Sequence, residues 1–221
     1  MIGFVPRYCT TSFSAMARSP KLPTLKPRKA PRQPRSEQTV AALLEAAAQV
    51  LEQHGLEGFN TNAIAQRAGV GIGSLYQYFP GKDALTLALM RREDERFDEE
   101  ASMALAEPTG LDALKSFVGA CVRQQLLRPN LARLLDIEQA RPELRKEAKD
   151  TATLHAILRA ILERGDLPRQ ARPDIAVGDL LAIIQGLTDA AGERGEVDIA
   201  DLQRRIEPAV FGYLRVDLGR A

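Results

Sequence analysis

The sequence predicts an all-α protein: a three-helix helix-turn-helix domain followed by a larger helical domain. Apolar residues recur at helical spacing from Val40 onwards, and no stretch shows the two-residue alternation of a half-buried β-strand. Two short helical patterns meet at residues 68–71, a connection as tight as that of a helix-turn-helix. A chain of 221 residues is long enough for one or two compact domains and a tail.

Residues 1–35 are a basic arm. They contain eight basic side chains and no acidic one, which leaves 22 basic against 29 acidic residues in the rest of the chain. The eight are Arg7, Arg18, Lys21, Lys26, Arg28, Lys29, Arg32 and Arg35. The arm also contains six prolines and little apolar surface, so we expect it to be disordered. A basic arm on an acidic body indicates binding to a polyanion.

The first helix of the helix-turn-helix domain, which we place at residues 36–85, is expected to begin near Ser36, a suitable N-cap. Gly55 is its expected end, because glycine readily ends a helix. Its apolar face consists of Val40, Leu43, Leu44, Ala47, Val50 and Leu51. Leu56 and Phe59, in the loop that follows, are expected to fill the small core.

Thr61 is expected to cap a second, short helix, which ends at Gly69. The third helix is expected from about Ile72 to Phe79, with Leu75 and Phe79 facing inwards. Pro80 and Gly81 then break the helical pattern.

The helical domain is expected over residues 86–216, with a short tail at 217–221. A long helix starts near Lys82 and runs to about Leu105, and apolar stripes then recur in four further segments. The segments contain Leu111 to Val122, Leu131 to Glu138, residues 142–164, and Ile175 to Leu187. The last helix, from Ile199 to Leu214, is expected to kink or split at Pro208.

Several residues in the helix-turn-helix segment resemble the TetR family of transcriptional regulators. They are Ile64-Ala65, Ala68-Gly69-Val70, Tyr76-Gln77-Tyr78-Phe79 and Lys82, and the match extends back through the first helix. The resemblance implies a homodimeric DNA-binding regulator, most often a repressor, that reads a pseudo-palindromic operator and is released by a small-molecule effector. It also implies a cytoplasmic protein without a cofactor and without a membrane partner. In the family a Ser or Thr commonly stands at the position of Gly71, so a hydroxyl that could bind phosphate is missing here.

The third helix is the expected DNA reader. Gly73 lets the backbone approach the groove. Gln77 and Tyr76 are large polar residues that a core does not need: Gln77 can pair with base edges, and Tyr76 can contact a thymine methyl or a phosphate. The resemblance implies phosphate contacts for Tyr78 and Lys82, and Thr61 is expected to face the DNA backbone. The whole predicted surface consists of Thr61, Ile72, Gly73, Ser74, Tyr76, Gln77, Tyr78 and Lys82, with Arg32 and Arg35 of the arm reaching the minor groove.

By resemblance, the C-terminal helices bind the effector, expected to be hydrophobic, and dimerise. Candidate polar residues of the pocket are Cys121, Gln125, Glu138, His155 and Gln185. Candidate dimer residues are Leu180, Ile184, Leu187, Leu202, Ile206 and Val210, whose stripes could equally be the core of one chain. The helix from Lys82 to Leu105 is the expected lever between the two halves.

Two other functions are open. A nucleoid-type or protein-interaction module would bind DNA without sequence preference through its basic arm. An enzyme is disfavoured, because only His54 and His155 could serve as histidine bases and no nucleophile–base or metal-ligand spacing occurs. Cys9 and Cys121 lie too far apart in sequence to indicate a disulfide scaffold or zinc site, so a reducing cytosol is expected.

Three further features of the sequence concern targeting, membranes and cofactors. The acid-free N-terminus is similar to a transit peptide, and Met16 could be the true start. No apolar run approaches the roughly 18 residues that span a bilayer. The glycines at 69, 71 and 73 do not form a dinucleotide-binding fingerprint, since no strand precedes them.

Overall fold

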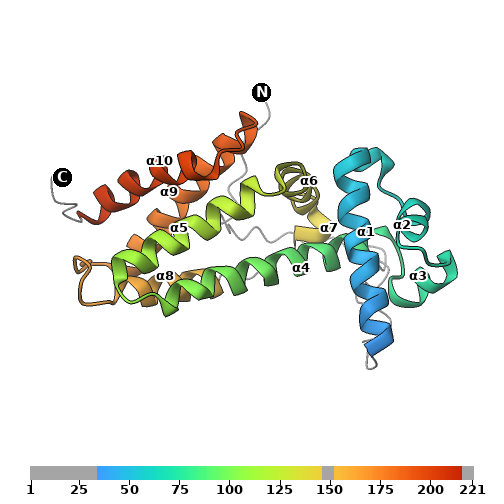
Figure 1. Ribbon diagram of the computed structural model, residues 1–221, viewed down its shortest axis with the longest axis horizontal. Coiled ribbons are helices and arrows are strands. Elements are labelled where there is room, and N and C mark those ends of the chain that lie inside the picture. Colours follow the sequence, from blue (N-terminus) through green and yellow to red (C-terminus); the bar gives the residue numbers. More distant parts are fainter. Residues whose placement is uncertain (1–33, 146–151, 216–221) are drawn as a thin grey trace, which may run out of the picture. The chain divides into compact units, whose positions relative to one another are not determined.

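The computed structural model describes residues 34–145 and 152–215, and every regular element in these ranges is a helix (Figure 1). The predicted all-α class is confirmed. The elements are α1 (Pro34–Gly58), α2 (Thr61–Arg67), α3 (Ile72–Tyr78), α4 (Lys82–Ser102), the 3₁₀ helix η1 (Met103–Ala106), α5 (Gly110–Leu126), α6 (Pro129–Gln139), α7 (Pro142–Arg145), α8 (Ala152–Leu162), α9 (Pro173–Glu193) and α10 (Ile199–Leu214).

The chain divides into two compact units. In the described residues the first unit comprises 34–92 and 134–145, and the second comprises 93–133 and 152–215. The boundary therefore falls inside α4 and again inside α6, and does not coincide with residue 85. The first unit takes in the end of α6 and all of α7, which the sequence assigns to the C-terminal domain.

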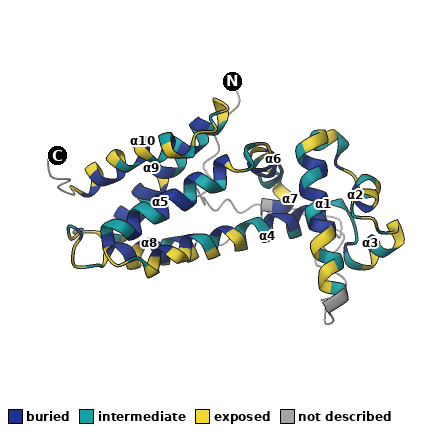
Figure 2. Ribbon diagram, in the orientation of Figure 1, coloured by how far each residue is buried: buried dark blue, intermediate teal, exposed yellow. Residues whose placement is uncertain are grey.

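The core of the helix-turn-helix forms where α1, α2 and α3 pack together. α2 packs against both α1 and α3, and the inner faces of these helices are buried (Figure 2). The largest fully buried side chains there are Leu43, Leu51, Phe59, Ile64, Leu75 and Phe79. Leu75 lies within α3 and Phe79 directly after its end, in extended conformation, and both are buried, which confirms that these two side chains face inwards.

α1 begins at Pro34, two residues before the expected cap Ser36, and helical structure continues past the predicted stop to Gly58. Gly55 nevertheless interrupts it, with φ 63° and ψ −168°. Residues that carry a side chain rarely adopt a positive φ, which explains why a glycine stands at this break. Phe59 is then buried, as expected, and Leu56 is half-buried.

The cap of α2 differs from the prediction. Asn60, and not Thr61, is the N-cap, since its side-chain oxygen accepts a hydrogen bond from the backbone N–H of Ala63 at 2.9 Å. Thr61 is the first residue inside the helix. Both types of residue cap helices well, so the pair Asn60-Thr61 was ambiguous in sequence. Gly69, at φ 68°, ends the turn after α2 as predicted.

The second unit has a core built around α5. This helix packs against η1, α8, α9 and α10, and α9 packs in turn against α8 and α10. The core contains apolar side chains from all of them, among them Phe117, Val118, Leu158, Ile161 and Phe211. The predicted helix over residues 142–164 is present as α7 and α8, with residues 146–151 outside the described ranges.

Two residues of the loop after α8 hold the start of α5. The Asp166 carboxylate accepts the backbone N–H of Gly110 at 2.8 Å and that of Leu111 at 3.2 Å. The Thr109 hydroxyl accepts the next amide, that of Asp112, at 3.0 Å. Arg164 donates to three backbone carbonyls of the segment before α5, those of Leu105, Glu107 and Thr109. The amides at this helix start therefore have partners that secondary structure alone does not provide.

The hydrogen bonds from these backbone amides to Asp166 make the stability of the second unit depend on pH. The Gly110 amide, more than any other group, holds the pKa of the Asp166 carboxyl below its ordinary value of about 3.9. The pKa of Asp166 is lower in the folded protein than in the unfolded chain. Ionised Asp166 therefore stabilises the fold fully above its unfolded pKa, and this stabilisation is lost as the pH falls through its folded pKa.

We expect Asp166→Asn to lower the melting temperature by a few degrees at pH 7, and the difference from the original protein to shrink near pH 3. Asp174→Asn is the matched control, because the Asp174 side chain is 78% exposed and pairs only with the exposed Arg159 on the surface. Thermal unfolding followed by circular dichroism measures both. An equal loss at both pH values would contradict the role of the charge.

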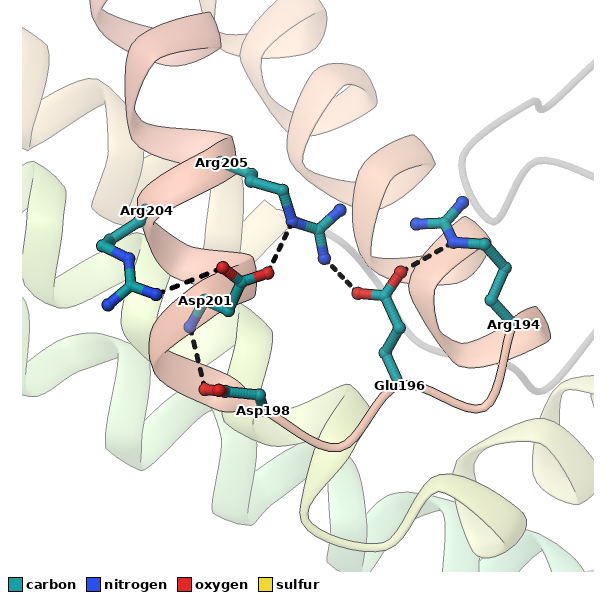
Figure 3. Close-up of polar contacts among 6 residues, drawn as sticks. All are labelled: Arg194, Glu196, Asp198, Asp201, Arg204 and Arg205. Carbon is teal, nitrogen blue, oxygen red and sulfur yellow. Dashed lines mark hydrogen bonds and ion pairs between the residues drawn. The ribbon is translucent and has the colours of Figure 1, made fainter.

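A chain of ion pairs joins the α9–α10 loop to the first turns of α10 (Figure 3). Arg205 lies between Asp201 and Glu196, Glu196 also accepts from Arg194 at 2.6 Å, and Asp201 accepts from Arg204 at 3.1 Å. These arginines hold the pKa values of the Glu196 and Asp201 carboxyls below their ordinary range. All five side chains reach solvent, so the network orders the loop more than it stabilises the fold.

Two features of α9 and α10 bear on the sequence analysis. α10 continues through Pro208, so the predicted split does not occur; Pro208 is exposed, and water can bind the backbone carbonyl that loses its partner. Within the described ranges, α9 alone is long and apolar enough to cross a membrane by length and composition. One face of α9 is buried in the core of its unit, and the core helices of soluble proteins meet the same criterion.

Candidate nucleic-acid interface

α3 presents a face of mixed character to solvent. Ile72 and Tyr76 are 38% and 42% exposed, and Gly73 and Gln77 are exposed beside them. A side chain added at Gly73 would meet no atom within 4 Å, so this glycine fills no packing role in the described structure. Ser74 and Tyr78 are half-buried at the edge of the face. The four exposed residues are the part of α3 that a DNA groove could contact.

Tyr76 is tied to the neighbouring helix. Its hydroxyl lies 3.1 Å from the Thr61 hydroxyl of α2, and the two form a hydrogen bond. Two residues that the sequence predicts as separate DNA contacts are therefore coupled across the helix-turn-helix.

Both basic side chains between Ser36 and Leu85, a stretch that the structure describes throughout, are held by the protein itself. Arg67 donates to the side-chain oxygens of Gln49 at 2.9 Å and Gln53 at 2.7 Å on α1. Lys82 is half-buried, with its ammonium 3.5 Å from the Leu56 carbonyl oxygen and 5.3 Å from the centre of the Phe59 ring. The same stretch contains five acidic residues, so few positive charges remain for phosphates.

The two arm residues that the sequence assigns to the minor groove, Arg32 and the Arg35 side chain, lie outside the described residues. The other predicted contacts, from Thr61 to Lys82, lie in the first unit.

The predicted pocket residues do not all lie in one unit. Glu138 belongs to the first unit, where its carboxylate accepts a hydrogen bond from Arg141 at 2.7 Å. Gln125 lies buried in the second unit beside Gly192, where an added side-chain carbon would come within 2.8 Å of the Gln125 amide. Cys121 packs at the edge of the same core, and Gln185 has a buried Nε2 without an acceptor among the described residues. His155 is half-buried on α8.

A polar hollow of about 310 Å³ lies on the surface of the second unit. Its lining consists of Glu107, Asp112, Lys115, Ser116, Gly119, Arg123 and Gln203. None of the five candidate pocket residues is among them. The hollow is open to solvent and carries both signs of charge, unlike the apolar pocket that the sequence leads us to expect.

The dimer candidates require a correction. Leu180, Ile184, Leu202, Ile206 and Val210 are at most 1% exposed within a single chain, and Leu187 packs against the same core. A side chain already covered by its own chain offers no surface to a second one. Leu180, Ile184, Leu202, Ile206 and Val210 are therefore core residues of the protomer, the alternative that their spacing left open, whereas the half-buried Leu187 stays a candidate.

Sequence reasoning missed two polar groups that organise the site. Asn60 leaves the Thr61 hydroxyl available to Tyr76, and Arg141 bridges Glu138 to Asp83 in the first turn of α4, at 2.7 and 3.0 Å. Asn60 could have been found, because asparagine is among the best N-caps. Arg141 could not, since its partners lie in different helices and only the tertiary fold brings them together.

Comparison with known proteins identifies the first unit. Residues 43–89 match the model of the family described as bacterial regulatory proteins, tetR family. The HTH-type transcriptional repressor KstR of Mycolicibacterium smegmatis is 36% identical over 90 residues, which cover 40% of this chain and 44% of that protein. The match thus spans less than half the length of this curated relative. An uncharacterized HTH-type transcriptional regulator of Mycobacterium bovis is 26% identical over 84% of this chain and 97% of its own length.

Solved structures share the fold over most of the chain. The fatty acid degradation regulator FadR of Bacillus halodurans superposes with a TM-score of 0.69 at 20% identity, covering 84% of this chain and 99% of that one. SmeT, the repressor of a Stenotrophomonas maltophilia multidrug efflux pump, superposes with a TM-score of 0.60, also at 20% identity, covering 79% of this chain and 91% of that one. At this identity the likeness concerns the fold alone. The helix-turn-helix segment, residues 43–89, is the part of the chain that matches the TetR family.

Proposed function

We propose that the protein is a homodimeric, effector-responsive transcriptional repressor of the bacterial cytoplasm that binds a pseudo-palindromic operator. The observation that carries the proposal is the exposed face of α3, where Gln77 and Ile72 flank a glycine on a helix that the fold presents to solvent. Gln can form paired hydrogen bonds with adenine, and Ile can contact a thymine methyl group.

Dimerisation is part of the proposal because one seven-residue helix contacts few base pairs. Two copies of α3 in a symmetric dimer would read two half-sites in successive major grooves. We assign the dimer contact to the outward faces of α9 and α10, where Ile175, Ala182, Ala209 and Tyr213 are exposed. The buried stripes of the same helices are not available for it.

The effector site is proposed within the second unit, along the polar positions of α5 and α9. Gln125 and Gln185 are the side chains that would orient a mainly apolar molecule there. Such a ligand releases DNA only if it binds one conformation better than another, and a coupling of about 1–3 kcal/mol is typical. The helices that pass between the units, α4 and α6, are the proposed route.

The test selects preferred sites from a random-sequence duplex library with the purified protein. We expect Gln77→Ala to reduce the discrimination between preferred and altered sites by about 1–3 kcal/mol, because a base contact is lost. Lys82→Ala should leave this discrimination unchanged and affect all sequences by the same factor, because a lysine held against Leu56 and Phe59 contacts no base. Gel-shift titrations on the selected and scrambled duplexes measure both effects.

Footprinting of the original protein decides between this function and its alternative. A protected, reproducible site supports a sequence-specific repressor. Uniform protection of all DNA would instead establish a nucleoid-type protein that binds through its basic arm.

A further inference from the structure

The bond between the Thr61 and Tyr76 hydroxyls has no role in building the helices that it joins. Asn60 already caps α2 through the Ala63 amide, so the Thr61 hydroxyl is not needed for the helix start. Tyr76 is 42% exposed, and the core of α3 is provided by Leu75 and Phe79. A hydrogen bond between two solvent-accessible hydroxyls contributes little to folding, since water would satisfy both groups.

The geometry divides the two hydroxyls into an inner and an outer group. Thr61 is half-buried at the first position of α2, whereas Tyr76 extends from the exposed face of α3. Each hydroxyl has one proton to donate and two lone pairs. When the Thr61 hydroxyl donates to the Tyr76 oxygen, the proton of the Tyr76 hydroxyl points outwards. The hydrogen bond from Thr61 then makes the Tyr76 hydroxyl a stronger donor to an external acceptor.

The electrostatics of the first unit indicate which acceptor it would meet. Arg67 is engaged by Gln49 and Gln53, and Lys82 lies against Leu56 and Phe59. Charged donors are therefore scarce on this surface, and neutral hydroxyls can bind a phosphate oxygen without a salt bridge.

We propose that Thr61 is a positioning residue that orients the Tyr76 hydroxyl towards a DNA phosphate, so that the two residues act as one unit. Tyr76 then fixes the register of α3 on the backbone and reads no base, while Gln77 and Ile72 carry the sequence preference. The proposal rests on the proposed function. It replaces two independent expectations with one coupled contact: a thymine-methyl or phosphate contact by Tyr76, and a backbone contact by Thr61.

The test is a double-mutant cycle on the duplex that the original protein enriches from a random-sequence library. Tyr76→Phe is expected to weaken binding about tenfold and Thr61→Val several-fold, because a bond to a charged phosphate is lost or misoriented. The double variant should bind no more weakly than Tyr76→Phe. Thr61→Ser keeps the hydroxyl and should restore nearly full affinity. Replacing single phosphates by methylphosphonates should identify one position whose neutralisation weakens the original protein but leaves Tyr76→Phe unchanged.

Tyr78→Phe serves as the comparison, because Tyr78 lies on the same helix but is half-buried. Its effect should multiply with that of Thr61→Val, as expected for independent sites. Multiplying losses for Thr61→Val and Tyr76→Phe would overturn the proposal, as would a Tyr76→Phe variant with full affinity, since phenylalanine keeps any contact to a thymine methyl. Enrichment of no duplex by the original protein would overturn the proposed function instead, so the two failures are distinct.

Discussion

Removal of residues 1–33 is expected to weaken DNA binding strongly while leaving the preferred sequence unchanged. The truncation removes seven of the eight basic residues of the arm and ends before Pro34, where α1 begins. Between Ser36 and Leu85 the domain contains two basic and five acidic residues, and both bases are engaged within the protein. The arm is therefore the main proposed source of phosphate contacts.

The salt dependence of binding gives the size of the effect. Each neutralised phosphate adds about 0.9 to the slope of log K against log salt concentration. If six basic residues of a dimer contact phosphates, the advantage of the complete chain changes by about 10³-fold between 50 and 200 mM salt. Fluorescence anisotropy with one duplex over this range of salt measures both slopes.

A matched variant separates charge from chain length. Replacing the same seven residues by glutamine keeps the arm and removes its charge, so it should reproduce the flat slope of the truncated protein. An unchanged slope in both variants would show that the phosphates are bound elsewhere, with Lys82 of the first unit as the next candidate.

The sequence predicts the helices of this protein well because their signals are local. The apolar stripe of α1, the glycine at position 69, and the Leu75–Phe79 pair of α3 each depend on residues within a few turns of one another. The fold class and the reading helix follow from such patterns. The start of α2 does not follow from the sequence, because Asn60 and Thr61 both have the chemistry of a cap and only the geometry distinguishes them.

The sequence does not predict what each apolar helix face packs against. The stripes on α9 and α10 have the same spacing whether they pack against their own chain or a second copy, and the structure buries them in their own chain. Glu138 likewise looks like a pocket residue in sequence, since a carboxylate that follows Leu131, Leu134 and Leu135 indicates a buried polar site. Its partner Arg141 follows a helix end, and Asp83 lies more than fifty positions earlier.

That ion triad explains how the end of α6 is held to the start of α4 within the first unit. The Glu138 side chain is only 7% exposed, and the structure gives it Arg141 as a charged partner at 2.7 Å. Arg141 also contacts Asp83 at 3.0 Å, and hydrogen bonds to Asp83 and Glu138 raise the pKa of its guanidinium. A buried carboxylate is costly without such a partner, so the arginine matters more than a surface ion pair would.

We therefore expect Arg141→Met to destabilise the first unit substantially. Breaking a buried ion pair by removing one partner costs about 3–5 kcal/mol, and because the Arg141 side chain is 35% exposed we expect a loss of about 2–3 kcal/mol. Urea unfolding followed by far-ultraviolet circular dichroism measures it. The double variant with Glu138→Gln should recover most of the loss, because the buried charge is then removed together with its partner. Asp83→Asn, which alters only the more exposed carboxylate of the triad, should have a smaller effect. If Glu138→Gln adds to the loss instead of relieving it, the buried charge is not the cause, and the methylene groups of Arg141 hold α6 against α4 by packing alone.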